Sequence, residues 1–396
     1  MSGFIKSAKV AAGSVALALG LSTAAAAQDY DWPRLMVIAT PGTSTGSFAS
    51  TNGWGPVFQK ETGTTVRIVP EDSELMRNRR LTDREDVAIA SVSAAEMASQ
   101  TEGVGGYASA KAIPQRILWH HNDTPWGFVV AGDSEIQSLA DIGKGGVRVT
   151  SGVFSPAIVS VVTEALPGFI GLTPEEAQEK ITYVPASSYG ENCRSVIEGK
   201  SDVAYCSPIS SVLSEMEGAP GSIRWLEMDP EDKEGWSRFL NFRGMTIPTK
   251  ISMGVKTATG VDSMASNFVY AVPVTAEVDF AYNMAKWLHQ SYDAYKGTHA
   301  LATRMGVEQF RDFLNANPIP VHEGTAKYLR EIGQWTDEDD AWNNAAIEKM
   351  DAWVAARQAG MKAAMEQGVE INFENEAFLN IIAEYTKDLE PFRSRL

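Results

Sequence analysis

Short apolar runs alternate with amphipathic segments along most of the chain. Segments with the apolar spacing of helices separate many of these runs, among them 71–82, 157–166 and 276–296. This alternation predicts an α/β fold, with a mostly parallel sheet and helices on both of its faces. The apolar runs that predict buried strands lie at 35–39, 64–70, 86–90, 117–119, 126–131, 146–150, 181–184, 202–206 and 268–273.

The strand–helix pattern occurs twice, which predicts two lobes with a cleft between them. A change in composition at 229–250 indicates a return crossing to the first lobe, and Thr336 before Asp337 is a good helix N-terminus. We expect hinges near 125–128 and 243–250. The expected divisions are a first lobe at 28–126, a second lobe at 127–244, a return to the first lobe at 245–324, and a helical C-terminal extension at 325–396.

The loop after the first strand has the strongest chemical signal. Its hydroxyl side chains are Thr43, Ser44, Thr45 and Ser47, and a helical segment follows them. A strand that ends in small residues and opens a helix leaves backbone N–H groups free to bind a carboxylate or another polar ligand. An ordinary turn explains the same residues. The spacing of Gly42 and Gly46 matches neither a phosphate-binding P-loop nor a dinucleotide-binding motif.

Further loops at 91–93 and 119–123 also follow predicted strands. Ligands of open α/β sheets bind where parallel strands end, so these loops are expected to face the same cleft as residues 40–47.

The first 27 residues match a secretory signal peptide. Lys6 and Lys9 precede an apolar stretch at 10–21, and Ala25-Ala26-Ala27 fits a small-residue cleavage site before Gln28. We therefore expect export to the periplasm and removal of residues 1–27. No later stretch is apolar and long enough to predict insertion into a membrane.

Charge argues against some partners. The chain has 34 basic and 50 acidic residues, so without the two lysines of the signal peptide its formal charge is 32 − 50 = −18. Such a balance argues against nucleic acids and anionic membrane surfaces as partners.

The cysteine and histidine spacing predicts no metal site. Cys193 and Cys206 are expected on a helix and at the end of the next strand. An exported protein can oxidise them, but the sequence leaves their pairing open.

His120 and Arg243 are candidates for binding a carboxylate. His120 and His121 are adjacent, so at most one of them is expected to face the cleft if the segment is extended. Arg67, Arg148 and Arg194 are alternatives to Arg243, which lies best at the return crossing.

Five segments in order resemble the TAXI family of TRAP-transporter solute-binding proteins. The first two are the Thr-Pro-Gly-Thr-Ser-Thr-Gly-Ser-Phe segment that ends at Phe48 and the Asp-Val-Ala-Ile-Ala-Ser-Val-Ser segment that ends at Ser93. The other three are Ile-Gln-Ser-Leu-Ala-Asp-Ile-Gly-Lys-Gly-Gly-Val-Arg-Val, Glu-Gly-Lys-Ser-Asp-Val-Ala-Tyr, and Asn-Pro-Ile-Pro-Val-His-Glu-Gly-Thr-Ala-Lys-Tyr. The resemblance covers roughly residues 34–333 and implies a type II periplasmic-binding-protein fold.

The resemblance also implies a function and a set of contacts. Members bind a small organic solute, often a carboxylate or an amino acid, and deliver it to a membrane permease without a cofactor. His120-His121-Asn122 stands where the family usually has Tyr-Pro-Glu, so the ligand stays open. By position, the implied contacts are Thr43, Thr45, Ser47, Phe48, Ser91 and Ser93 from the first lobe and Ser151, Phe154, Ser155, Tyr189 and Ser207 from the second.

The sequence therefore predicts a solute-binding receptor that is not an enzyme. One alternative is the ligand-binding part of a membrane sensor. The other is an exported hydrolase, although the chain has neither a Gly-x-Ser-x-Gly nor a His-Glu-x-x-His motif.

Overall fold

The computed structural model describes residues 30–395. Trp32–Leu396 form one compact unit, to which the following description applies. The predicted signal peptide lies outside the described residues.

The first lobe begins with three parallel strands. β1 (Leu35–Thr40) pairs with β2 (Thr65–Pro70) on one side and with β3 (Ile89–Ser93) on the other. The connections are α1 (Gly46–Thr62) and α2 (Glu74–Thr82), and α3 (Ala94–Glu102) follows β3. These elements confirm the predicted strand–helix alternation, with β3 beginning three residues later than its apolar run.

Two long antiparallel strands occupy the middle of the sheet. β4 (Gln115–Ala131) pairs with β10 (Asp262–Pro273), and β10 also pairs antiparallel with β3. The expectation of a mostly parallel sheet is therefore wrong for its centre. The reason is that β10 enters from the second lobe as a returning strand, whereas a helical crossover would have made it parallel.

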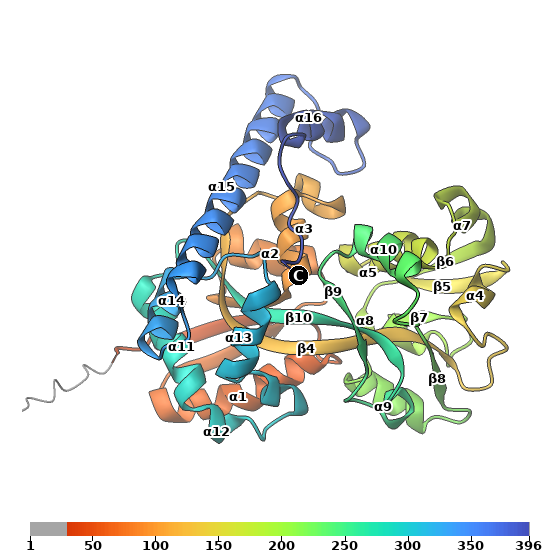
Figure 1. The fold of residues 1–396 in the computed structure, drawn as a ribbon, viewed down its shortest axis with the longest axis horizontal. Coiled ribbons are helices and arrows are strands. Elements are labelled where there is room, and N and C mark those ends of the chain that lie inside the picture. The colour runs from red at the N-terminus through yellow and green to blue at the C-terminus, as the bar shows by residue number, and fades with distance from the viewer. Residues whose placement is uncertain (1–29, 396) are drawn as a thin grey trace, which may run out of the picture. The chain divides into compact units, whose positions relative to one another are not determined.

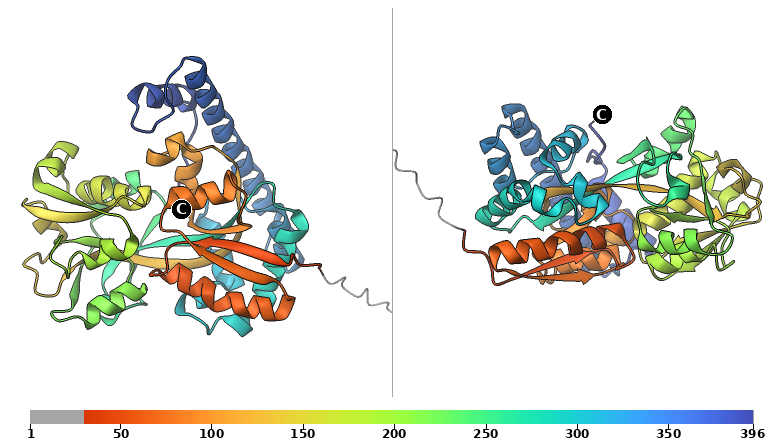
Figure 2. Two further views of the ribbon diagram at one scale, coloured as in Figure 1. Left: turned by 180° about the vertical axis from the view of Figure 1, so that it is seen from behind. Right: turned by 90° about the horizontal axis from the view of Figure 1, so that it is seen from below.

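β4 replaces two predicted strands. The sequence predicted strands at 117–119 and 126–131 with a loop between them, but His120, His121 and Asn122 are fully buried inside one continuous strand. Figure 1 shows β4 running from the first group of elements into the second, and Figure 2 shows the same crossing from two further directions.

The second lobe surrounds the far end of β4. There β7 (Ala204–Cys206) and β8 (Ile223–Leu226) pair antiparallel with β4, while β5 (Val147–Gly152) and β6 (Ile181–Ala186) form a separate parallel pair. The helices of this part are α4 (Leu139–Ile142), α5 (Pro156–Ser160), the π-helical η2 (Val161–Ala165), α6 (Leu166–Phe169), α7 (Pro174–Lys180), α8 (Tyr189–Arg194), α9 (Ser211–Gly218) and α10 (Lys233–Phe242).

Each lobe has its own hydrophobic core. The first includes Trp54 and Trp119, and the second includes Phe128 and Trp236. β4 passes from one to the other between Trp126, which pairs with β10, and Gly127, which pairs with β7. The second core also contains Ile251, Val255 and Met264. These residues belong to the stretch 245–324, which the sequence predicted as the return to the first lobe. The domain boundaries given above stay predictions.

The return crossing and the rest of the first lobe follow β8 and α10. The single helix predicted at 276–296 forms as two helices, α11 (Val278–Gln290) and α12 (Tyr292–Tyr295). The elements are β9 (Thr246–Lys250), η3 (Lys256–Ala258), α11 (Val278–Gln290), α12 (Tyr292–Tyr295), η4 (Ala300–Arg304), α13 (Val307–Ala316) and α14 (Glu323–Glu331).

The C-terminal extension is helical, as predicted. Thr336 caps α15 (Asp337–Glu366) and forms a capping box with Asp339, and α16 (Glu376–Thr386) packs back on α15 (Figure 1). Arg357 of α15 is fully buried and donates to carbonyls of α3 and of η1 (Gly105–Ser109), which fixes the extension to the first lobe.

No one helix in residues 30–395 has the length and apolarity of a membrane span. A pair bent by 105°, Pro156–Phe169 with Pro174–Lys180, meets those criteria only when its two parts are taken together.

Candidate ligand-binding site

A cavity of about 60 Å³ lies where the two lobes face each other. Its size corresponds to roughly four to six water molecules, since one water needs about 10–15 Å³ of such space. The first lobe lines it with Pro41, Thr45, Gly46, Ser47, Asp72, Glu74, Arg77, Ser93, Thr124, Ser266 and Phe268. The crossing strand and the second lobe add Trp126, Phe154, Ser155, Ala157, Ile158, Tyr189, Tyr205, Ser207, Ser210 and Arg243.

The loop after β1 forms the first wall. Thr45 is the N-cap of α1: its hydroxyl accepts from the Phe48 N–H at 3.3 Å and donates to the Gly42 carbonyl at 2.8 Å. These two bonds fold the loop tightly and leave Ser47 buried in the first turn of the helix. A hydroxyl N-cap is the local signal that places this wall.

Hydroxyl caps recur around the cavity. Ser93 caps α3 by accepting from the Glu96 N–H at 2.9 Å, and Ser155 caps α5 by accepting from the Ile158 N–H at 3.1 Å. Because each strand or loop ends at a helix start, its capping hydroxyl lies at the edge of the lobe that faces the other lobe.

A buried hydrogen bond between Arg77 and Glu96 supports the wall behind Ser93. Arg77 donates to Glu96 at 3.0 Å, and both side chains are almost completely buried. Burial raises the pKa of Glu96 to about 8, against the opposing effect of Arg77. Glu96 also accepts from the Gln100 amide, so this carboxyl is held rigidly beneath the pocket.

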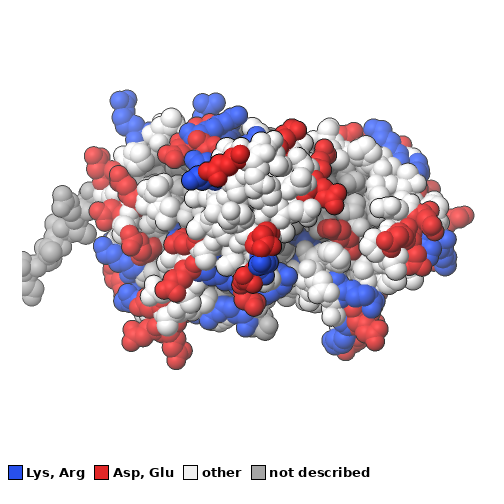
Figure 3. All heavy atoms as spheres, turned by 90° about the horizontal axis from the view of Figure 1, so that it is seen from above, with Lys and Arg blue, Asp and Glu red and all other residues white. Residues whose placement is uncertain are grey.

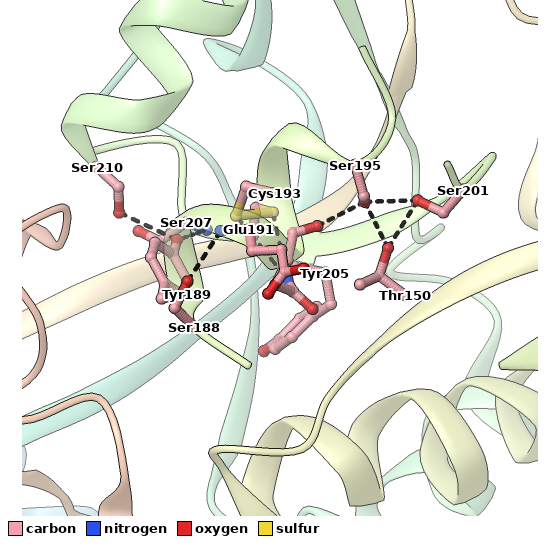
Figure 4. The surroundings of a disulfide bond; sticks show 12 residues. Thr150, Ser188, Tyr189, Glu191, Cys193, Ser195, Ser201, Tyr205, Ser207 and Ser210 are labelled. Atoms are coloured by element: carbon pink, nitrogen blue, oxygen red, sulfur yellow. Dashed lines mark hydrogen bonds between the residues drawn. A yellow bond between two sulfur atoms is a disulfide. The ribbon is translucent and has the colours of Figure 1, made fainter. Parts of the chain in front are cut away.

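Tyr189 organises the second-lobe wall. Its phenol oxygen accepts from the Ser207 N–H at 2.8 Å and lies 3.1 Å from the Ser210 hydroxyl (Figure 4). Burial raises the pKa of Tyr189 to about 12, so the phenol stays neutral at physiological pH. A neutral phenol held in this way keeps Ser207 and Ser210 at the rim of the cavity.

A disulfide fixes the two elements that carry this wall. Cys193 of α8 is bonded to Cys206 of β7 with their Cα atoms 6.0 Å apart, which answers the question that the sequence left open (Figure 4). Asn192 donates to the Tyr205 carbonyl beside the bond at 3.0 Å. The bond therefore ties Tyr189 on α8 to Tyr205 and Ser207 on and after β7.

Aromatic rings form the apolar part of the pocket. The ring of Trp126 stacks on Tyr205 with centroids 4.9 Å apart and meets Tyr189 edge-on at 6.0 Å. Phe154 and Phe268 complete this surface from opposite lobes. Apolar walls with a few fixed polar groups are typical of small-molecule sites.

Several buried polar atoms at the pocket have no hydrogen-bond partner within residues 30–395. They are Ser207 Oγ, Trp126 Nε1, Arg77 Nε and Arg243 Nε. Buried polar groups in proteins almost always have a partner, so these atoms are available to hydrogen-bond with water or with a polar ligand.

Charges of both signs line the cavity. Asp72 and Glu74 oppose Arg77 and Arg243, so the pocket differs from the acidic chain as a whole. On the molecular face in Figure 3 acidic and basic side chains are interspersed, without one dominant basic patch. Of the alternatives to Arg243, Arg148 pairs with Asp202, Arg194 pairs with Glu215, and Arg67 is exposed on β2.

The structure brings together eight of the residues proposed from the sequence. They are Thr45, Ser47, Ser93, Phe154, Ser155, Tyr189, Ser207 and Arg243, contributed by both lobes.

Six other proposed residues do not line this cavity. Thr43 is exposed, Ser44 and Phe48 are half-buried, and Ser151 is buried within β5. Two more are engaged inside the first lobe, as their contacts show.

Ser91 and His120 have internal partners. Ser91 Oγ lies 3.0 Å from His121 Nδ1, whereas His120 contacts the Arg304 carbonyl at 2.8 Å and Asp123 at 3.1 Å. Ser91, His120 and His121 are therefore engaged inside the first lobe, and none of them lines the pocket.

Sequence reasoning missed the acidic residues of the pocket. Asp72 and Glu74 follow β2 and flank Ser73, the N-cap of α2. The rule that singled out residues 40–47 and 91–93 applies equally to this loop, so the strand-end position was the available signal. Trp126, Tyr205 and Phe268 had no such signal, since they looked like ordinary strand residues.

Chemistry of other kinds has little support in the part of the chain that the structure describes. No group of three or more His, Cys, Asp or Glu side chains there is arranged to hold a metal ion. The Ser91–His121 pair resembles a nucleophile with a base, but both residues are fully buried and burial holds the pKa of His121 well below its ordinary value. That pair is therefore closed to substrates in this structure.

Comparisons with known proteins place the chain in a family. The model of the NMT1-like family matches residues 38–333, which is most of the chain. The search of curated proteins finds no match.

Solved structures with a similar arrangement include periplasmic and solute-binding proteins. MatC from Rhodopseudomonas palustris with bound malate is 12% identical, with 80% of this chain and 100% of that chain covered and a TM-score of 0.46. The aliphatic sulphonate binding protein SsuA from Escherichia coli is 12% identical, with 92% and 82% covered and a TM-score of 0.35. A TctC solute-binding protein from Polaromonas is 12% identical, with 81% and 97% covered and a TM-score of 0.36. Similarity at this level carries no argument about the ligand.

Proposed function

We propose a function from one premise: the chain belongs to the NMT1-like family. The proposal is that it is an extracytoplasmic solute-binding receptor, of the TAXI type within TRAP transport systems. It captures a small organic solute and delivers it to a membrane permease. The observation that carries the proposal is the small cavity between two lobes, with unpartnered polar atoms on its wall.

The proposed ligand is a small carboxylate or amino acid. Arg243 lines the cavity with an unpartnered Nε, and a guanidinium binds a carboxylate with two parallel hydrogen bonds. Capping hydroxyls and the Ser207 side chain supply neutral donors and acceptors. The cavity volume favours a compact ligand over a sugar acid or a peptide.

The proposed mechanism involves no covalent chemistry. The lobes hinge near Trp126, where β4 exchanges one partner strand for another, and closure buries the solute. A permease that binds the closed form better is then recruited by ligand, because ligand shifts the population toward that form.

Thermal melts of the mature protein against amino acids, keto acids and dicarboxylates test the proposal. A ligand that binds only the folded state stabilises it by about 2.7 kcal/mol at a hundredfold excess over Kd. A higher melting temperature with one chemical class is the expected result. No rise across the panel, after unfolding and refolding to strip co-purified solute, would contradict the receptor function.

Two alternatives predict other results. A membrane sensor would give the same melts but would bind a sensor domain and not a permease, which pull-down with each purified partner distinguishes. An exported hydrolase would turn over an ester or amide substrate, and the buried Ser91–His121 pair makes that outcome unexpected.

A further inference from the structure

Two carboxylates of the first lobe contact backbone N–H groups of the second. Asp72 Oδ2 accepts from the Tyr189 N–H at 3.2 Å, and Glu74 Oε2 accepts from the Ala157 N–H at 3.3 Å. Asp72 and Glu74 lie at the start of α2, whereas Tyr189 and Ala157 lie in the first turns of α8 and α5. Each carboxylate therefore joins one lobe to the other.

The two carboxylates supply hydrogen-bond acceptors to helix N-termini of the second lobe. The first N–H groups of a helix have no partner inside that helix. Ser188 and Ser155 cap α8 and α5 by accepting from Glu191 N and Ile158 N, which leaves the N–H groups of Tyr189 and Ala157 to other acceptors. A carboxylate is a strong acceptor for such a donor, because its charge complements the positive end of the helix.

Both carboxylates are also anchored in their own lobe. Asp72 Oδ1 accepts from the Gly42 N–H at 2.9 Å, in the loop that carries Thr45 and Ser47. Glu74 Oε2 accepts from the Tyr107 hydroxyl at 3.3 Å. They stand in fixed positions on the pocket wall, so the second lobe docks on a preset pair of acceptors.

We propose that Asp72 and Glu74 are the latch that holds the two lobes together over the pocket. The consequence for ligand retention rests on the proposed receptor function, whereas the latch itself does not require a ligand. With the latch formed, the two lobes are held together beside the pocket. When it breaks, the Gly42 loop and the N-termini of α5 and α8 separate and the cavity opens.

The geometry predicts a larger effect on lobe opening for Asp72→Asn than for Glu74→Gln. Asp72 uses one oxygen for each lobe, so Asp72→Asn places an amide NH₂ group against one of two N–H donors. Both contacts of Glu74 are made by the same oxygen, so Glu74→Gln can keep both with its remaining carbonyl oxygen. Asp72→Asn is therefore expected to shift the ratio of open to closed molecules about tenfold, the equivalent of one charge-assisted hydrogen bond, and Glu74→Gln less.

Gly42 gives a second way to break the latch. A Cβ at this position would lie 2.0 Å from Asp72 Oδ1 and 2.6 Å from its Cγ. Gly42→Ala must push the Asp72 carboxylate away without changing any charge. It is expected to open the lobes as Asp72→Asn does.

The experiment measures the distance between the lobes in the full mature chain. Spin labels on Lys60→Cys in α1 and Glu179→Cys in α7 report that distance by pulsed electron paramagnetic resonance, and both positions are exposed. The natural cysteines are already paired and do not take the label. The matched control is Glu71→Gln, whose carboxylate accepts from Ser73 N in its own loop.

The expected result is a longer distance in Asp72→Asn, in Gly42→Ala and in the double variant Asp72→Asn with Glu74→Gln. The parent and Glu71→Gln should share the shorter one. Unchanged distances in the double variant and in Gly42→Ala would overturn the latch. If Asp72→Asn fails to fold, as judged by its melt, Gly42→Ala decides alone. Because no ligand is added, this result is independent of the melts that test the receptor function.

Discussion

Arg243 is the side chain of the pocket with the clearest chemical preference. It is 8% exposed, it lines the cavity, and its Nε has no partner in residues 30–395. A planar guanidinium fixes a carboxylate through two hydrogen bonds, whereas an ammonium acts as a point charge. Its position, at the end of α10 and just before the return crossing, lets it act only where the two lobes meet.

Arg243→Lys is therefore expected to weaken binding of a carboxylate ligand. The loss of a charged hydrogen bond corresponds to roughly tenfold to a hundredfold in Kd, with little change in the melting temperature of the free protein. Calorimetric titration with the ligand found in the melts measures it. Arg194→Lys, which alters a surface ion pair with Glu215, is the control. Equal affinity in both variants would remove Arg243 from the site.

A second residue-scale prediction concerns Glu96, whose pKa burial raises from 4.5 to about 8. Because the folded-state value lies above the unfolded one, the stability from this carboxyl is fully present below about pH 4.5 and is lost as the pH rises through about 8. The stability of the parent relative to Glu96→Gln should fall across that window, by at most about 1.4 kcal/mol per pH unit. Urea unfolding of both proteins at several pH values measures this, and parallel curves would contradict it.

At this scale the sequence predicts the cap at Thr336, because a hydroxyl before a run of acidic helix residues has a local physical role. Thr45, Ser93 and Ser155 were expected as ligand contacts, and the structure shows that each is also a helix cap. Ser91 and His120 are polar residues in strands, and only the tertiary pairing shows that their partners are His121, Arg304 and Asp123. Asp72 contacts a residue 117 positions away, a distance that no local pattern reaches.

Among the elements, α15 shows how one residue can attach a whole extension. The Arg357 guanidinium donates to the carbonyls of Gln100, Tyr107 and Ala110 at 2.7, 2.5 and 2.9 Å. Helix ends leave such carbonyls without partners, and here a side chain from 247 to 257 positions away satisfies them. Burial lowers the pKa of Arg357 to about 10, so it remains charged at neutral pH.

Arg357→Met is expected to destabilise the protein by about 3 kcal/mol, because it leaves several buried carbonyls unsatisfied. Arg330→Met is the comparison: Arg330 of α14 pairs with Asp340 of α15 in an exposed position, and its loss should cost at most about 1 kcal/mol. Urea unfolding of the two variants measures the difference. Equal losses would mean that α15 is held by its apolar contacts and not by Arg357.

The elements that sequence reasoning misplaced share one cause. β4 contains the polar run from His120 to Thr124, which reads as a loop although the strand continues through it. The pairing of this run with β10 satisfies its backbone, and the two lobes bury its side chains. Parallel strands with helical crossovers are visible locally, but an antiparallel strand that returns from another lobe is not.

In residues 30–395 the cores of the two lobes lie on either side of the cavity, and a third, smaller apolar cluster joins α15, α16 and Ala108. Two α/β lobes and a helical extension follow from the repeated pattern, because each unit has its own strands and capped helices. The size of the cavity does not follow, since it depends on how closely the lobes approach. The contacts of Asp72 and Glu74 with the second lobe help to set how closely the two lobes approach.

This dependence gives a prediction about ligand length. With the lobes in the arrangement described, the small cavity between them limits the length of a ligand that fits without moving the lobes. In a homologous series of unbranched monocarboxylates, affinity should rise with length while each added methylene is buried, by about 0.8 kcal/mol at most, and then fall. A longer member must separate the lobes and break the contact of Asp72 with the Tyr189 N–H.

The same series measured on Asp72→Asn separates cavity size from latch strength. If the latch sets the limit, this variant binds short members more weakly and long members relatively better, so its optimum moves to greater length. If the rigid walls set the limit, both proteins share one optimum and differ by a constant factor. Melting-temperature shifts across the series distinguish these outcomes. The second would mean that the side chains of Trp126 and Tyr205, and not the approach of the lobes, determine which solutes fit.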